Sequence, residues 1–554
     1  MNVNSVNSGA RNVSSPAQHR LIENLAKKTE PSVSSSSSSG SLNHALQIIK
    51  AKDNANEGVK LSDKASLIGS IDFKSSQKPF TITDASAYKE GSDVQEMAYA
   101  LAGNDNRDDV DLSDYTVLKA SNADNQINIS QRSDGGIIVN VDGQEQEFTA
   151  EEARRLIIDG GDGNDKIVAG EDVKTALHIV GGRGDDTIIT GRGNDIVYDN
   201  YGSNYISTKD GNDVVIANQL DYKNGKPVGE DKRNAFQKLW DKITGNDERA
   251  HAVKGNVIDG GAGDDYLEGG LGQDAIYGGD GNDVIYGLDG DDTIYGGAGD
   301  DYIDGGRGND TLYGGAGNDK VFGGLGKDTI YGGIGDDVIA GGGGKDTIYA
   351  GVGANKVTAD KQDTVNASED SKVSYLESVR VPREIKIEGN AGFRSRVQSD
   401  LDTLASIEPG KAMYSGLDEN GRKVTIKSTD GGNVCGYNGN TAVLKDDGSA
   451  NRGSDSTIAY NRSRIRIGGG DWGRRPPVVG MFHEMAHSYD AGAGILDDRL
   501  FNYDGTRAEK GGVKAAELQA VGLGEVTDQV QMNPEGISEN DLRAALDLAR
   551  RTRY

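Results

Sequence analysis

Hydrophobic residues recur every nine positions through the middle of the chain. Between residues 260 and 349, one aliphatic side chain follows each G-G-x-G-x-D-like segment, in ten consecutive copies. These side chains are Leu267, Ile276, Ile285, Ile294, Ile303, Leu312, Val321, Ile330, Ile339 and Ile348. One apolar position in nine cannot form a core alone, but turns stacked on one another bury it. The pattern predicts a parallel β-solenoid with a thin interior.

Less regular copies of the repeat lie between residues 160 and 197, and a different pattern precedes them. Apolar and polar residues alternate over 127–129 and 137–141, which predicts a β-hairpin. Thr149 and Glu152 have the spacing of a capping box at the start of a short helix. Because a repeat stack needs a different end piece, we expect these elements to cap the solenoid.

The repeat is interrupted over residues 218–258. Phe236, Leu239, Trp240 and Ile243 follow helical spacing there and predict an amphipathic helix. A helix packed on the side of the solenoid is the simplest interpretation; a membrane or partner anchor is the alternative.

The last third of the chain has the mixed pattern of an α+β domain. It predicts a strand at 385–387, a helix near 393–404 and an exposed edge strand at 457–467. A buried helix follows, with an entrance at Pro476 and Pro477 and an end near Gly492.

Composition and pattern together divide the chain into six segments. These are 1–90, Ser-rich and disordered; 91–158, an N-terminal cap; 159–217, the first part of the solenoid; 218–258, a helical insertion; 259–378, the main solenoid with its cap and linker; and 379–554, the α+β domain.

Half of the net negative charge of the chain lies in the regular repeats. The whole chain has a formal net charge of −28, and residues 260–349 contain eighteen acidic and four basic residues. The sixth position is always Asp: Asp265, Asp274, Asp283, Asp292, Asp301, Asp310, Asp319, Asp328, Asp337 and Asp346, with Asp165 and Asp186 in earlier copies. Carboxylate and glycine carbonyl oxygens together are the ligands that Ca²⁺ prefers. The repeat resembles the RTX, or haemolysin-type, calcium-binding β-roll.

A second metal signal lies in the predicted helix of the last domain. His483-Glu484-Met485-Ala486-His487 is an H-E-x-x-H motif. Residues four apart share one face of a helix, so both imidazoles can bind one Zn²⁺ while Glu484 acts as general base. Of the six histidines, only this pair lies in the last 300 residues.

A catalytic zinc site needs a third protein ligand. No third histidine follows the pair, and the single cysteine, Cys435, excludes both an internal disulfide and a cysteine-based zinc site. The best candidate is Glu517, in the run 513–523 that we interpret as a second helix. The competing carboxylates are Asp490, Asp497, Asp498, Asp504 and Glu509, and the candidates for oxyanion stabilisation are Tyr460, Tyr489, Tyr503 and Arg475.

Three stretches of the last domain carry a family resemblance. They are R-P-P-V-V-G-M-F-H-E-M-A-H-S-Y (475–489), E-L-Q-A-V-G-L (517–523) and an ending that begins S-E-N-D-L-R-A-A-L (538–546). From about residue 381 the chain resembles the NleD-like zinc metallopeptidases, effectors that bacteria inject by type III secretion. The resemblance implies zinc on His483, His487 and Glu517, catalysis by Glu484, and host proteins, signalling kinases among them, as substrates.

The net charge of the chain bears on its partners, and the composition of its N-terminal segment bears on its route of export. A strongly acidic chain is a poor ligand for nucleic acid, and no run of eighteen apolar residues predicts a transmembrane helix. The serine run 34–39 and the absence of an apolar signal core favour a type III secretion signal, with a possible chaperone site near 21–26. We expect a protein that is secreted or injected into a host cell.

The sequence therefore predicts a secreted zinc metalloendopeptidase with one Zn²⁺ and several Ca²⁺ ions. The alternative from another class is a calcium-dependent surface or matrix protein with a non-catalytic peptidase-like domain. A type I exported protease is a third interpretation, although its peptidase would precede the roll. We also expect residues 381–554 in isolation to show no response to calcium.

Overall fold

The computed structural model describes most of the chain beyond residue 78. It covers 79–217, 254–460 and 476–493, with gaps at 90–91, 103–109, 377–378, 390, 429–432, 438–441, 443–449 and 451. It also covers 222–223, 226–227, 500–501, 513–514, 517, 520–521 and 538–548. The chain divides into two units, Met1–Gln77 and Lys78–Tyr554, of which the first lies outside the described residues. Among the described residues, no helix is long and apolar enough to span a membrane.

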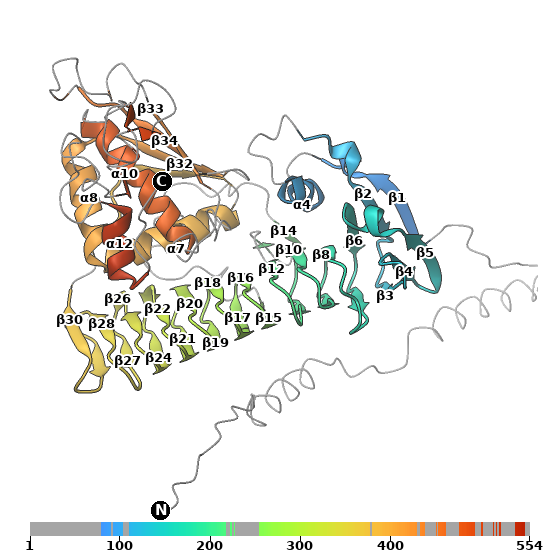
Figure 1. Ribbon diagram of the computed structural model, residues 1–554, viewed down its shortest axis with the longest axis horizontal. Coiled ribbons are helices and arrows are strands. Elements are labelled where there is room, and N and C mark those ends of the chain that lie inside the picture. The colour runs from blue at the N-terminus through green and yellow to red at the C-terminus, as the bar shows by residue number, and fades with distance from the viewer. Residues whose placement is uncertain are drawn as a thin grey trace, which may run out of the picture. The chain divides into compact units, whose positions relative to one another are not determined.

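Two large sheets, A and B, form a solenoid of about ten turns over residues 158–375 (Figure 1). Sheet A contains, in spatial order, β1 (Phe80–Asp84), β2 (Thr116–Ala120), β6 (Leu156–Asp162), β8 (His178–Arg183), β10 (Ile196–Asp199), β12 (Val214–Ala217), β16 (Tyr266–Leu271), β18 (Val284–Asp289), β20 (Tyr302–Arg307), β22 (Lys320–Phe322), β25 (Val338–Ala340), β28 (Lys356–Ala359) and β30 (Lys372–Tyr375), with β23 (Leu325–Gly326) and β26 (Gly343–Gly344) beside them.

Sheet B runs alongside it. It contains, in spatial order, β29 (Thr364–Asn366), β27 (Thr347–Tyr349), β24 (Thr329–Ile334), β21 (Thr311–Ala316), β19 (Thr293–Ala298), β17 (Gln273–Asp280), β15 (Lys254–Ala262), β11 (Tyr205–Ser207), β9 (Thr187–Ile189), β7 (Lys166–Ala169), β3 (Gln126–Gln131), β4 (Ile137–Val141) and β5 (Gln144–Phe148).

Each turn of the regular solenoid takes two nonapeptides, one strand in each sheet. Parallel neighbours are therefore eighteen residues apart, as Ile276 and Ile294 are in sheet B. All ten aliphatic residues of the repeat are buried in one continuous core, which confirms the predicted thin interior. Glycine permits the tight corners: Gly279 has a φ of +121°, and a Cβ there would lie 1.8 Å from the carbonyl oxygen of Gly261.

The N-terminal cap contains the predicted hairpin and capping box. Strands β3 and β4 pair antiparallel, and Thr149 and Glu152 exchange hydrogen bonds at the start of α5 (Ala150–Ala153). The cap also holds η1 (Ala85–Ala87), α4 (Asp93–Ala102) and η3 (Leu112–Asp114). Strand β1 lies inside the segment 1–90 that we predicted to be disordered, so residues 80–84 belong to the folded cap because they pair with β2.

The insertion between β12 and β15 is described only in part. Its described residues are the backbone of a two-stranded hairpin, β13 (Tyr222–Lys223) and β14 (Lys226–Pro227). The amphipathic helix predicted near 236–243 lies outside the described residues.

The C-terminal part is an α+β domain. Its helices are α7 (Ala391–Ser406), α8 (Glu408–Asn420), α10 (Pro477–Ala493) and α12 (Glu539–Ala545) (Figure 1). Its main sheet has the order β31 (Ile385–Glu388), β32 (Val424–Ser428), β34 (Ser456–Tyr460) and β33 (Val434–Tyr437). A smaller sheet pairs β35 (Leu500–Phe501) with β36 (Val513–Lys514).

Two local predictions for this domain are wrong. Strand β34, predicted as an exposed edge, lies between β32 and β33, which makes β33 the edge next to it. Val513 and Lys514, predicted to begin a helix, pair with Leu500 and Phe501 as a strand, whereas the other described residues of that run, 517, 520 and 521, have helical backbone. Pairing with a distant segment overrides the local pattern in both cases.

Sheet A and the C-terminal domain share one apolar core. Tyr266, Tyr286, Tyr302 and Phe322 from the solenoid belong to the same buried cluster as Phe393 and other residues of α7, α8 and α10. The boundary near residue 378 therefore separates two sequence patterns but does not separate two cores.

A buried arginine connects the two sides of this core. Arg396 on α7 is fully buried, with its guanidinium carbon 3.2 Å from the ring centroid of Tyr286. It contacts Asp400 at 2.6 Å and Glu268 of β16 at 3.6 Å. Tyr460 of β34 donates a 2.6 Å hydrogen bond to Asp400 and extends the network toward the main sheet of the domain.

Candidate functional site

Helix α10 carries the two histidines of the H-E-x-x-H motif on one face. Their spacing of four residues brings the imidazole rings to 4.9 Å between centroids, in an edge-to-face arrangement. Both side chains are buried, because almost the whole helix is enclosed in the shared core. The helix thus presents two imidazoles inside the protein.

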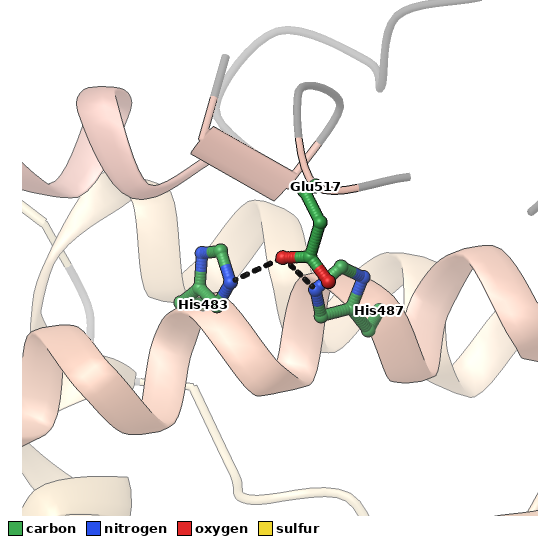
Figure 2. Close-up of side chains that lie close together, drawn as sticks. All are labelled: His483, His487 and Glu517. Atoms are coloured by element: carbon green, nitrogen blue, oxygen red, sulfur yellow. Dashed lines mark hydrogen bonds and ion pairs between the residues drawn. The ribbon is translucent and has the colours of Figure 1, made fainter. Parts of the chain in front are cut away.

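Glu517 completes a group of three potential ligands. Its Oε2 atom lies 3.4 Å from Nε2 of His483 and 3.3 Å from Nε2 of His487 (Figure 2). The three donor atoms lie within 4.8 Å of one another, as ligands of a single ion would. Two imidazole nitrogens and one carboxylate oxygen are a donor set suited to zinc.

His483 and Glu517 of this group shift one another's pKa values. Burial lowers the pKa of His483, but hydrogen bonds with Glu517 and Glu539 outweigh burial and raise it to about 9. Burial raises the pKa of Glu517, but the two histidines outweigh this and hold it well below its usual range. Glu517 therefore stays ionised and able to bind a cation.

Glu484 is buried on α10 between the two histidines in sequence. Its charge raises the pKa of Cys435 on β33, after the larger effect of burial, and the thiol pKa is about 12. Ser488 accepts a 3.0 Å hydrogen bond from Ser456 and lies 3.3 Å from the Cys435 sulfur. These contacts hold β33 and β34 against α10.

The competing third ligands do not join this group. Asp490 is fully buried on α10 and is not among the clustered donors of the described residues. Asp497, Asp498, Asp504 and Glu509 lie outside the described residues.

The four candidates for oxyanion stabilisation lie in different places, and two of them are described by the structure. Tyr460 is buried in the shared core, and its hydroxyl donates its hydrogen bond to Asp400. Tyr489 is half-buried, and its backbone carbonyl accepts a hydrogen bond from Asn420. Tyr503 and Arg475 lie outside the described residues.

A second set of acidic residues forms two ladders along the corners of the solenoid. In each ladder the backbone N–H of one Asp donates to Oδ1 of the Asp one turn later, as from Asp265 to Asp283 and from Asp274 to Asp292, at 2.8–2.9 Å. All twelve predicted calcium residues are buried members of these ladders: Asp165, Asp186, Asp274, Asp292, Asp310, Asp328 and Asp346 in one, and Asp265, Asp283, Asp301, Asp319 and Asp337 in the other.

The second carboxylate oxygen of these residues is suited to a cation. Oδ2 of Asp265, of Asp274 and of Asp301 is buried and accepts no hydrogen bond from any residue that the structure describes. A Cβ built on Gly260 would lie 2.6 Å from Oδ2 of Asp265 and 2.7 Å from the carbonyl oxygen of Gly278. Glycine therefore leaves open the space between two oxygens, and the site fits Ca²⁺.

Burial and mutual repulsion make the ion-free carboxylates hard to ionise. Burial is the largest cause that raises the pKa of Asp265 to about 8 and that of Asp301 to about 9, and the charges of neighbouring aspartates add to it. The positive charge of a bound cation would offset both effects and favour the ionised carboxylates.

Two family models match the chain. Residues 381–554 match Peptidase_M91, described as an effector protein. The RTX calcium-binding nonapeptide repeat matches at 157–172, 179–217 and in overlapping copies through 255–357. The C-terminal domain is a Peptidase_M91 effector domain. It follows an RTX calcium-binding repeat region, so both predicted resemblances are confirmed. A search of curated proteins finds no match.

The RTX ladders contain members that our sequence analysis missed. Asp195 and Asp213 occupy ladder positions in irregular copies of the repeat. Asn204, Asn256 and Asn355 fill equivalent positions with an uncharged amide. Searching for D or N at the sixth position without requiring both glycines would have found them.

In the Peptidase_M91 domain, the sequence analysis also missed Glu539. It is fully buried on α12, and its Oε2 lies 3.1 Å from Nδ1 of His483. The segment that contains it was noted only as part of a family resemblance. Its acidic residue at the start of a helix is ordinarily explained by the helix dipole.

Proposed function

We propose that this protein is a secreted bacterial zinc metalloendopeptidase whose RTX roll is loaded with calcium. The observation that carries the proposal is the group His483, His487 and Glu517, in which two imidazoles and one ionised carboxylate converge on a buried point. The match to a peptidase effector family over the same residues supports it.

The donor set fits one zinc ion with an open coordination position. Zinc bound there would lower the pKa of a coordinated water and polarise a substrate carbonyl. His483 and His487 hold the metal as neutral ligands through Nε2, and Glu517 supplies the negative charge.

Glu484 would act as the general base and then as the general acid. It lies next to His483 on a buried helix, where solvent is restricted. It takes a proton from the attacking water and returns it to the amine that leaves when the peptide bond breaks.

Strand β33 is the best place for an extended substrate. It forms an edge of the four-stranded sheet, with Val434 exposed, and lies next to α10. A peptide added to this edge would place its backbone near Glu484. Because β34 lies between two strands, this role falls to β33 and not to the edge strand that we predicted at 457–467.

The substrates would be host proteins, with signalling kinases the class that the family resemblance suggests. The effector domain and the RTX repeats favour a protein that is exported or injected. In that role the roll would fold on calcium outside the producing cell and carry the peptidase as a rigid support.

The replacement of Glu484 by Ala tests this function directly. Host-cell extracts are treated with wild-type or Glu484→Ala protein, and new protein N-termini are compared by mass spectrometry. We expect the wild type to generate new termini and the variant to generate none, while both bind one zinc per chain, because the base is not a ligand.

Exposed Glu419→Ala on α8 is the matched control and should cleave as the wild type does. Zinc-free wild-type protein without proteolysis would instead support the alternative, a calcium-dependent surface-binding protein. Activity of Glu484→Ala within a few-fold of the wild type would remove Glu484 from the reaction.

A further inference from the structure

The C-terminal segment S-E-N-D-L-R, residues 538–543, has no role in the function proposed above. It forms the start of helix α12, which packs against the zinc helix α10. Ser538 caps the helix and accepts a hydrogen bond from the backbone N–H of Asp541. This cap places the next residue, Glu539, at the beginning of α12 and against His483.

The two ring nitrogens of His483 face different carboxylates. Nε2 lies 3.4 Å from Glu517, on the side where the metal ligands converge. Nδ1 lies 3.1 Å from Oε2 of Glu539, on the opposite side of the ring. Among the described residues, His487 contacts a carboxylate through Nε2 alone. Within the described part of the domain, His483 is therefore the histidine of the pair that carboxylates hold from both sides.

Glu539 is itself held firmly. Its side chain is fully buried, and its Oε1 accepts a 2.7 Å hydrogen bond from Nε of Arg543, one helical turn later. Arg543 is fully buried as well. A buried carboxylate is costly unless it is paired and hydrogen-bonded, so this arginine compensates the burial of Glu539 and restricts its position.

We propose that Glu539 is a positioning residue of the zinc centre. Its Oε2 lies 3.1 Å from Nδ1 of His483, and this contact favours the tautomer that carries the proton on Nδ1, whose Nε2 lone pair points at the metal and is a better electron-pair donor. The C-terminal helix is therefore a part of the metal site, and Arg543 supports it. This inference rests on the proposed zinc function.

Zinc affinity and cobalt spectroscopy of the full-length protein test the role of Glu539. Zinc dissociation constants are measured by competition with a chromophoric chelator, and visible spectra are recorded after substitution with Co²⁺, which reports ligand geometry. We expect Glu539→Ala to weaken zinc binding about 10- to 100-fold and to shift the cobalt spectrum. Glu539→Gln keeps a hydrogen-bond acceptor without the charge and should give a smaller loss.

Asp547→Asn is the matched control, because it removes one exposed carboxylate just beyond the end of α12 and should leave both readouts unchanged. The inference is overturned if a Glu539 variant that still unfolds cooperatively binds zinc within twofold of the wild type, with an unaltered cobalt spectrum. Should the Ala variant fail to fold, the Gln variant is judged by the same criterion. A wild-type protein that binds neither metal overturns the zinc function and this inference together.

Discussion

Glu517 contributes the negative charge of the proposed zinc centre. Hydrogen bonds from His483 and His487 outweigh its burial and hold its pKa well below the usual range. The carboxylate is therefore ionised at any pH at which the protein would work, and it contacts both histidines through one oxygen.

Replacement of Glu517 by Ala should remove zinc as well as activity, because only two protein ligands would remain. We expect less than a tenth of a zinc per chain after dialysis against a weak chelator, roughly a loss of 10-fold or more in affinity. Metal analysis of Glu517→Ala beside Glu419→Ala checks this. Stoichiometric zinc in Glu517→Ala would identify another carboxylate as the ligand.

At the scale of residues, the sequence predicted which residues can bind a metal better than it predicted which residues lie in contact with them. The histidine pair follows from helical spacing alone, and the structure brings Glu517 to it. Glu539 could not be found in the same way, because its role depends on the contact between α10 and α12, which are more than forty residues apart in sequence.

The carboxylate ladders determine how the roll responds to pH. Without calcium, the folded pKa of Asp265 is about 8 and that of Asp301 about 9, above the ordinary value of 3.8. The folded state then holds more protons than the unfolded chain between these limits, so its stability falls as pH rises. Calcium competes with the same protons, and its stabilising effect grows with pH.

We therefore expect calcium-free full-length protein to melt at a higher temperature at pH 5.5 than at pH 8. Added calcium should raise the melting temperature more at pH 8 than at pH 5.5, and more than magnesium does. Differential scanning calorimetry on protein passed through a chelating resin measures both effects. Calcium-free protein that loses stability on acidification would refute the account of the ladders.

Two variants separate the effect of a buried ladder carboxylate from the effect of an exposed one. Asp301→Asn should reduce both the calcium response and the pH dependence, because it removes a charged ladder member. Asp280→Asn removes the same charge from an exposed side chain of β17 and should change neither.

At the scale of elements, regular periods predicted the structure well, and isolated patterns predicted it poorly. The nonapeptide period leads directly to the strands and their core. The alternation at 457–467 correctly indicated a strand, but it could not reveal that β33 pairs beside β34, since the partner precedes it by some twenty residues.

At the scale of the whole molecule, one face of sheet A of the roll is part of the core of the C-terminal domain. Arg396 links α7 to Glu268 and Tyr286 of sheet A, and the same network reaches Tyr460 of the domain sheet. Residues 381–554 alone would expose this surface, so the expectation of an isolated domain indifferent to calcium does not describe a complete folding unit.

Loss of calcium should therefore loosen the peptidase domain as well as the roll. We expect hydrogen exchange in α7 and α8 of the full-length protein to accelerate when calcium is removed, although neither helix contains a ladder residue. Arg396→Met should show faster exchange in α7 even with calcium, since it leaves buried carboxylates without their cation. Unchanged exchange in α7 while the roll unfolds would show that the two parts are independent.

A signal for this shared core is present in the repeat. The ninth position is Tyr in every second copy, namely Tyr277, Tyr295, Tyr313, Tyr331 and Tyr349, which stack along sheet B. In the other copies it varies, as Glu268, Tyr286, Asp304, Phe322 and Ala340, all buried on sheet A. The eighteen-residue period thus marks which face is covered, although only the structure identifies what covers it.

Zinc-edge X-ray absorption of the full-length protein with one equivalent of zinc tests the central claim most directly. The account predicts two imidazole nitrogens at about 2.0–2.1 Å and oxygen ligands from Glu517 and water, with no sulfur at about 2.3 Å. Glu484→Ala should leave this ligand shell unchanged. A shell without imidazole, or one with a single imidazole, would contradict a catalytic zinc on His483 and His487.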